Sequence, residues 1–214
     1  METLFEVIIL LLLLINFRLI GTGKIMVSLK MLALQALSIN ILPWLTANET
    51  TTWILIVVIG STIIKVGLLP WMLTRVMRQA KIDRESRPFV GTTRSLLIGL
   101  GLLGLSWLAA DSLMMPVSGS VDTLLTSSAL FTMLSGAYLL CTRRTAIMQV
   151  IGFLVLENGV YLFGVVFAIQ EPWLVQAGVL LDLLAAVFVM GVMIEHINRA
   201  FAHIDTGLLS TLKD

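Results

Sequence analysis

Long runs of apolar residues constrain the fold of this chain more than any other feature of its sequence. Seven such runs lie at about 3–20, 25–46, 51–76, 93–114, 122–141, 145–169 and 173–198. A transmembrane helix needs about 20 consecutive apolar residues, whereas the strands of a membrane barrel alternate over about ten residues. The sequence therefore predicts an all-α, polytopic membrane helix bundle with seven transmembrane helices.

The composition agrees with a membrane protein and excludes several other classes. Of 214 residues, 58% are hydrophobic and only 13% are charged, whereas soluble domains carry about 25% charged residues. The net charge of +1 gives no basis for nucleic-acid binding, and the single cysteine, Cys141, cannot form an internal disulfide or hold a metal cluster alone. No nucleophile set, metal-ligand set or phosphate loop is visible, so we expect no catalytic centre, metal or cofactor in this chain.

The loop charges predict the orientation of the helices. Of the 14 Lys and Arg residues, 13 fall in alternate loops: Arg18, Lys24, Lys30, Arg75, Arg78, Lys81, Arg84, Arg87, Arg94, Arg143, Arg144, Arg199 and Lys213. Basic loops stay on the cytoplasmic side. We therefore expect the N-terminus outside and the C-terminus inside a cell inner (cytoplasmic) membrane. Glu2 and Glu6 replace the basic start of a signal peptide, so the first run is expected to be a retained span.

A weak internal repeat divides the chain. The second and third runs, with the polar segment after them, resemble the sixth and seventh, so that Gln35 corresponds to Glu157 and Lys65 to Asp182. Parallel repeats of this kind occur in transporters. We expect a first three-helix unit with a cytoplasmic loop at 1–90, a linking transmembrane helix at 91–120, and a second three-helix unit with a cytoplasmic tail at 121–214.

Four hydrophilic side chains lie near the centres of the predicted spans: Gln35, Lys65, Glu157 and Asp182. With a rise of about 1.5 Å per residue, each lies within roughly 6 Å of the membrane midplane. An acid or base at this depth costs about 2.5–3.5 kcal/mol on insertion scales, which marks it as a functional candidate. Their similar depth favours a proton relay along the membrane plane, with Tyr161, four residues after Glu157, on the same helix face.

The surroundings of these groups support further expectations. Gly152, Gly159 and Gly164 leave room for close helix approach or water. Pro70 cannot donate to the carbonyl of Val66, so the third helix should bend and free an acceptor near Lys65.

Charge balance predicts that not all of the central groups are ionised together. Two acids and one base would leave a net negative charge, and burial favours the neutral form of a carboxylic acid. We therefore expect at least one of Glu157 and Asp182 to be protonated for much of the time, or to face a base from another subunit. The alternatives are structural: Lys65 in a plain salt bridge, Gln35 as an interhelical hydrogen bonder, and Tyr161 in ordinary packing.

Several motifs carry a family resemblance. The Leu-Glu-Asn-Gly segment at 156–159 and the stretch at 178–190 resemble hydrogenase-4 component E, as do the segment at 63–70 and the ending at 205–213. The resemblance covers nearly the whole chain. It implies membership of membrane complexes related to respiratory complex I, including formate hydrogenlyase-type assemblies, with last spans similar to the K-type subunit of complex I and the C subunit of cation/proton antiporters.

By motif position, Glu157 and Asp182 match the two buried glutamates that line the proton path of the K-type subunit. The second is an aspartate here, one methylene shorter. The resemblance implies antiporter-like and quinone-subunit-like membrane partners, a nickel–iron hydrogenase or another redox arm, and surrounding lipids. Two alternatives remain: a subunit of a cation/proton antiporter or inorganic-carbon uptake complex without a hydrogenase, and a structural spacer between antiporter-like subunits and the redox arm.

Overall fold

The described part of the structure is helical. The computed structural model describes residues 2–46, 59–60, 62–80, 90–112, 120–167 and 191. Its elements are α1 (Glu2–Gly21), α2 (Ile25–Thr46), the π-helical segment η1 (Ile63–Leu68), α4 (Leu69–Ala80), α5 (Thr92–Ser112), α6 (Ser120–Thr142) and α7 (Ala146–Phe167). No strand occurs within these ranges.

Five helices, α1, α2, α5, α6 and α7, are long and apolar enough to cross a membrane. They match five of the predicted runs closely, and the second run coincides with Ile25–Thr46. The chain is therefore a multi-pass membrane protein. The third run is described only in part, as η1 and α4, and the seventh run and Asp182 lie outside the described residues. The count of seven and the orientation stay predictions.

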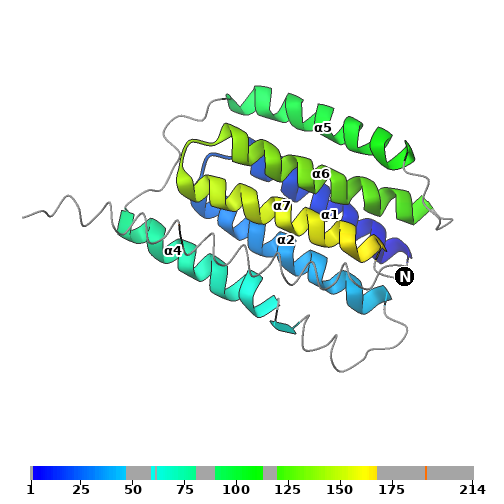
Figure 1. Cartoon of the computed structure of the whole chain (residues 1–214), viewed down its shortest axis with the longest axis horizontal. Coiled ribbons are helices and arrows are strands. Elements are labelled where there is room, and N and C mark those ends of the chain that lie inside the picture. The colour runs from blue at the N-terminus through cyan, green and yellow to red at the C-terminus, as the bar shows by residue number, and fades with distance from the viewer. Residues whose placement is uncertain are drawn as a thin grey trace, which may run out of the picture.

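Helices α1, α2, α6 and α7 lie side by side as an inner bundle, with α5 and α4 at opposite edges (Figure 1). Helix α5 packs on α6 and α1, whereas η1 and α4 pack on α2. The loops between α1 and α2 and between α6 and α7 are short, so each of these pairs is antiparallel. Residues from the first and last described helices therefore meet in one bundle interior.

Glycines bring α6 and α7 into the closest contact in the bundle. A Cβ atom at Gly136 of α6 would overlap the backbone of Leu156, and one at Gly152 of α7 would lie 2.8 Å from the backbone nitrogen of Leu140. Gly159 likewise lies against the backbone of Met133. Small residues permit such close packing of transmembrane helices. The predicted close approach is confirmed at Gly152 and Gly159, whereas a Cβ atom at Gly164 would meet nothing within 4 Å in the described structure.

The third run leaves the α-helical path directly before Pro70. Residues Ile63–Leu68 form a π-helical turn, and α4 begins at Leu69. Single π-helical turns are rare and frequently lie at functional sites. The sequence predicted an irregularity at this place, and its form is a wider turn that contains Lys65.

Arg143, in the loop between α6 and α7, ties this pair to α1. Its guanidinium donates a hydrogen bond to the carbonyl of Ile20 at 2.7 Å, and the side chain is buried. A cation beside the last carbonyls of a helix stabilises both the unpaired acceptors and the negative end of the helix dipole. The contact fixes the end of α1 relative to α6 and α7.

The bundle interior has a polar layer between two apolar clusters. One cluster includes Ile15, Leu32 and Val155, and the other includes Leu12, Ile39 and Leu162. Between them lie buried polar side chains, of which we call six the polar layer: Asn16, Gln35, Lys65, Thr132, Glu157 and Asn158. Polar groups out of contact with water must find partners within the protein, and these partners define the candidate site.

Candidate functional site

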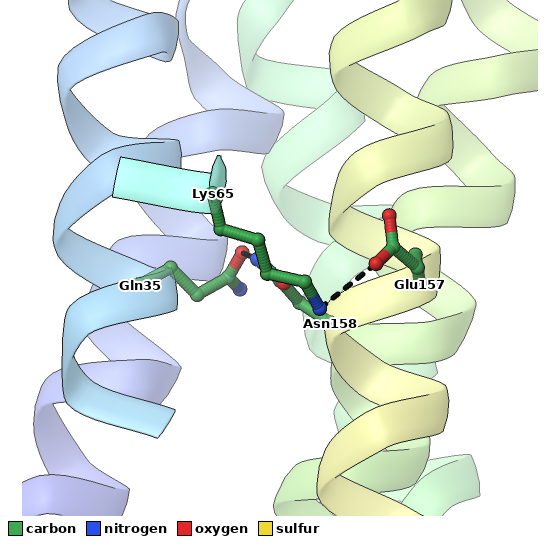
Figure 2. Close-up of polar contacts among 4 residues, drawn as sticks. All are labelled: Gln35, Lys65, Glu157 and Asn158. Carbon is green, nitrogen blue, oxygen red and sulfur yellow. Dashed lines mark hydrogen bonds and ion pairs between the residues drawn. The ribbon is translucent and has the colours of Figure 1, made fainter. Parts of the chain in front are cut away.

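An ion pair between η1 and α7 is the centre of the polar layer. Lys65 extends from η1 toward α7, and its Nζ lies 2.8 Å from Oε1 of Glu157 (Figure 2). The side chains are 6% and 2% exposed. Removing one partner of a buried ion pair costs about 3–5 kcal/mol, because the other charge is then uncompensated. Glu157 and Lys65 therefore depend strongly on each other.

Tyr161 completes the surroundings of the ammonium group. The Nζ of Lys65 lies over the Tyr161 ring, 4.9 Å from its centroid. Because Glu157 and Tyr161 are four residues apart on α7, one helix face presents both a carboxylate and a ring face to the same cation. A desolvated cation–π contact of this kind contributes about 2 kcal/mol. The predicted common face of Glu157 and Tyr161 is confirmed.

Gln35 belongs to a second set of contacts that crosses the whole bundle. Asn158 donates to Oε1 of Gln35 at 3.3 Å, Gln35 donates to Oδ1 of Asn16 at 3.0 Å, and Asn16 donates to Oγ1 of Thr132 at 2.8 Å. We call these four residues the amide network. Its members come from α7, α2, α1 and α6 in turn. Figure 2 shows the Gln35–Asn158 contact between α2 and α7, beside the ion pair.

The structure brings together four of the five side chains that the sequence predicted for the site. Lys65, Glu157 and Tyr161 are in direct contact, and Gln35 joins them through Asn158, the neighbour of Glu157. The fifth, Asp182, lies outside the described residues. The structural alternative for Gln35, an interhelical hydrogen bonder, describes its observed contacts.

Asn16 and Thr132 are members of the site that the sequence did not predict. Asn16 is the one amide in the run at 3–20, and a lone amide in an apolar span is a signal that could have been used. Thr132 gave no comparable signal, because α6 contains several Ser and Thr residues and a helical hydroxyl can bond to its own backbone. Thr132 does so as well, donating to the carbonyl of Ser128 at 2.7 Å.

The chemistry available at this site is acid–base and electrostatic. A carboxyl group can bind and release a proton, and the ammonium of Lys65 responds to the charge that results. Among the described residues, no three His, Cys, Asp or Glu side chains lie together as they would around a metal ion.

Comparison with known proteins places the chain in a family. It is 32% identical over 190 residues to the uncharacterized protein Rv0085 of Mycobacterium tuberculosis, across 86% of this chain and 84% of that protein. This chain belongs to the family of that mycobacterial protein. No family model matches the chain, and no solved structure does so either.

A more distant similarity connects this family to a named protein. The chain is 25% identical over 154 residues to hydrogenase-4 component E of Escherichia coli K12, across 72% of this chain and 71% of that protein. The protein of the same name from Shigella flexneri matches equally. The resemblance to hydrogenase-4 component E is therefore supported as distant homology.

Proposed function

We propose that this chain is a non-catalytic subunit of a complex I-like assembly of the hydrogenase-4 or formate hydrogenlyase type, in the inner membrane. In this proposal its Glu157–Lys65 pair is one station of a lateral proton path. The observation that carries the proposal is a buried acid–base pair at mid-span, between a π-helical turn and a neighbouring helix. The distant homology to hydrogenase-4 component E supports the type of assembly.

The pair can transfer a proton through changes in its charge balance. A proton that arrives on Glu157 neutralises the carboxylate, and Lys65 then lacks its opposite charge. The ammonium moves toward another acid, for which Asp182 is our candidate, and Glu157 can then release its proton onward. Electron transfer takes place in partner subunits, namely a redox arm with quinone-subunit-like and antiporter-like membrane neighbours.

A structural spacer is the second candidate, and the same ion pair favours it. A 2.8 Å contact between two buried charges also fixes how η1 packs on α7. The two candidates differ in the result expected when both charged residues are replaced by apolar ones. A spacer tolerates a well-packed apolar replacement of both charges, whereas a proton station does not.

The first prediction concerns Glu157→Gln in the assembled native complex. We expect proton transport, measured as vesicle acidification driven by the complex's own electron transfer, to fall at least about a hundredfold, the lower end of what a general acid–base group contributes to a rate. Assembly should persist, because glutamine keeps the shape of the side chain and its amide oxygen can still accept a hydrogen bond from the ammonium of Lys65, which offsets part of the cost of the lost charge. Glu6→Gln is the matched control, since Glu6 is an exposed acid on α1. Normal proton transport in Glu157→Gln would refute the relay.

The double variant Lys65→Met with Glu157→Leu separates the two candidates. It removes both charges together, so we expect it to assemble better than Lys65→Met alone. A relay predicts that proton transport stays lost in this variant. Recovery of transport together with assembly would instead establish the spacer. Identification of the subunits that co-purify with the chain tests the type of complex.

A further inference from the structure

The amide network has a uniform direction. Each amide nitrogen donates toward the next member, from Asn158 to Gln35, from Gln35 to Asn16 and from Asn16 to Thr132. Thr132 continues the series in the same direction, because its hydroxyl donates to the backbone carbonyl of Ser128. Hydrogen bonds aligned in this way polarise and strengthen one another in a medium of low dielectric constant. The network is therefore a stiff cross-connection through four helices.

Amide groups cannot store a proton near neutral pH, so the network itself is not a set of proton stations. Asn16, Gln35 and Thr132 are 0% exposed and Asn158 is 3% exposed. Such burial of amides is costly unless each is hydrogen-bonded, and hydrogen bonds between transmembrane helices contribute about 0.6–2 kcal/mol each. The network therefore holds the four helices together at the site and does not carry protons itself.

The connection to the ion pair runs through the backbone of α7. Glu157 and Asn158 are adjacent, so their side chains leave the helix about 100° apart. Lys65 contacts the first from η1, and Gln35 contacts the second from α2 (Figure 2). Two contacts in different directions at adjacent residues fix the rotation of a helix about its axis, which a single contact cannot do.

We propose that the amide network positions Glu157 against Lys65, with Asn16 and Thr132 as positioning residues on the far side of the bundle. Cutting the network at Thr132 loosens Asn16, then Gln35, and then Asn158. Helix α7 can then rotate, and the carboxyl of Glu157 spends more time away from the ammonium. This positioning role concerns the pairing of Glu157 with Lys65 and does not depend on the proposed function. Only the further expectation that weaker pairing alters proton transport rests on the proposed function.

The test measures how often Glu157 leaves the ion pair. Dicyclohexylcarbodiimide is a lipid-soluble reagent that modifies carboxylic acids in their protonated form, and an acid paired with Lys65 is protected from it. The rate of modification at Glu157, followed by mass spectrometry in the native complex, therefore reports pairing. Lys65→Met sets the upper limit of this rate, and Glu157→Gln sets the background.

Thr132→Val and Asn16→Leu should raise the modification rate of Glu157 about two- to fivefold. The upper value is the change in an equilibrium constant that corresponds to the loss of one hydrogen bond of about 1 kcal/mol. Thr132→Ser keeps the hydroxyl and should restore the wild-type rate. Thr142→Val is the matched control: Thr142 is also on α6 and donates to a backbone carbonyl, that of Tyr138. The modification rate of Glu157 in Thr142→Val should equal the wild-type rate.

A wild-type modification rate in assembled Thr132→Val or Asn16→Leu overturns the proposal. If both variants fail to assemble while Thr132→Ser and Thr142→Val assemble, the network is a structural anchor and the positioning role is also overturned. Normal proton transport in Glu157→Gln, combined with a raised rate in Thr132→Val, would refute the relay and leave the positioning role intact.

Discussion

At the scale of single residues, the ammonium of Lys65 has a position defined by two groups of different chemistry. Glu157 offers a full negative charge that a proton can cancel, whereas the ring of Tyr161 offers a permanent but weaker attraction. The ring therefore keeps attracting the ammonium when Glu157 is neutral. This arrangement would limit how far Lys65 moves during one transfer.

The corresponding prediction separates the ring of Tyr161 from its hydroxyl. Tyr161→Phe keeps the ring face and should keep at least about half of the proton transport, because Phe also binds cations through its ring. Tyr161→Leu removes the face and should lower transport about tenfold, which corresponds to roughly 1.4 kcal/mol. The same vesicle acidification measurement applies to both. A large loss in Tyr161→Phe would assign the role to the hydroxyl.

At the scale of elements, the α6–α7 pair is the rigid support of the site. The glycines at its contact place Glu157 and Asn158 on a helix whose other side lies directly on the α6 backbone. A side chain at these positions would force the helices apart, which costs about 1–3 kcal/mol in a well-packed interior. The close contact thus fixes the distance of α7, and the amide network fixes its rotation.

Gly159→Ala and Gly136→Ala should therefore lower the thermal stability of the purified complex. The added Cβ atoms meet the backbones of Met133 and Leu156, which cannot rotate away as a side chain can. Gly101→Ala and Gly104→Ala on α5 are the matched controls, since a Cβ atom there meets nothing within 4 Å. Detergent-solubilised unfolding curves measure the difference. Equal stability of all four variants would contradict the role of the α6–α7 contact.

At the scale of the whole molecule, the orientation of the chain in the membrane is a prediction that can be tested directly. Cys141 is the one cysteine in the sequence and is exposed at the end of α6. The distribution of basic residues predicts that this end faces the cytoplasm. The chain therefore carries a natural probe of its own topology.

A membrane-impermeant thiol reagent should label Cys141 in inverted vesicles and leave it unlabelled in intact cells. The reverse pattern is expected for Asn48→Cys in a Cys141→Ser background, because residue 48 lies in a predicted outer loop. Labelling is read by mass shift on a gel. Labelling of both positions from the same side would refute the predicted topology.

The sequence by itself determined where five apolar helices lie along the chain, and it predicted a common depth for the polar groups. Bilayer thickness sets the length of an apolar run, so α1, α2, α5, α6 and α7 could be predicted to within a few residues. Depth follows from counting residues along a helix, which is why Gln35, Lys65 and Glu157 were expected at one level. The π-helical turn was expected only as an irregularity, because a proline predicts that the helix is disturbed and not how.

Only the tertiary structure decided which of these groups meet. Apolar spans all resemble one another in composition, so the sequence does not say which helix faces lie together. The pairing of Lys65 with Glu157 and the route through Asn16 to Thr132 follow from the packing of α1, α2, α6 and α7. The physical reason is that depth is a local property of one helix, whereas rotation and neighbours depend on close packing with other helices.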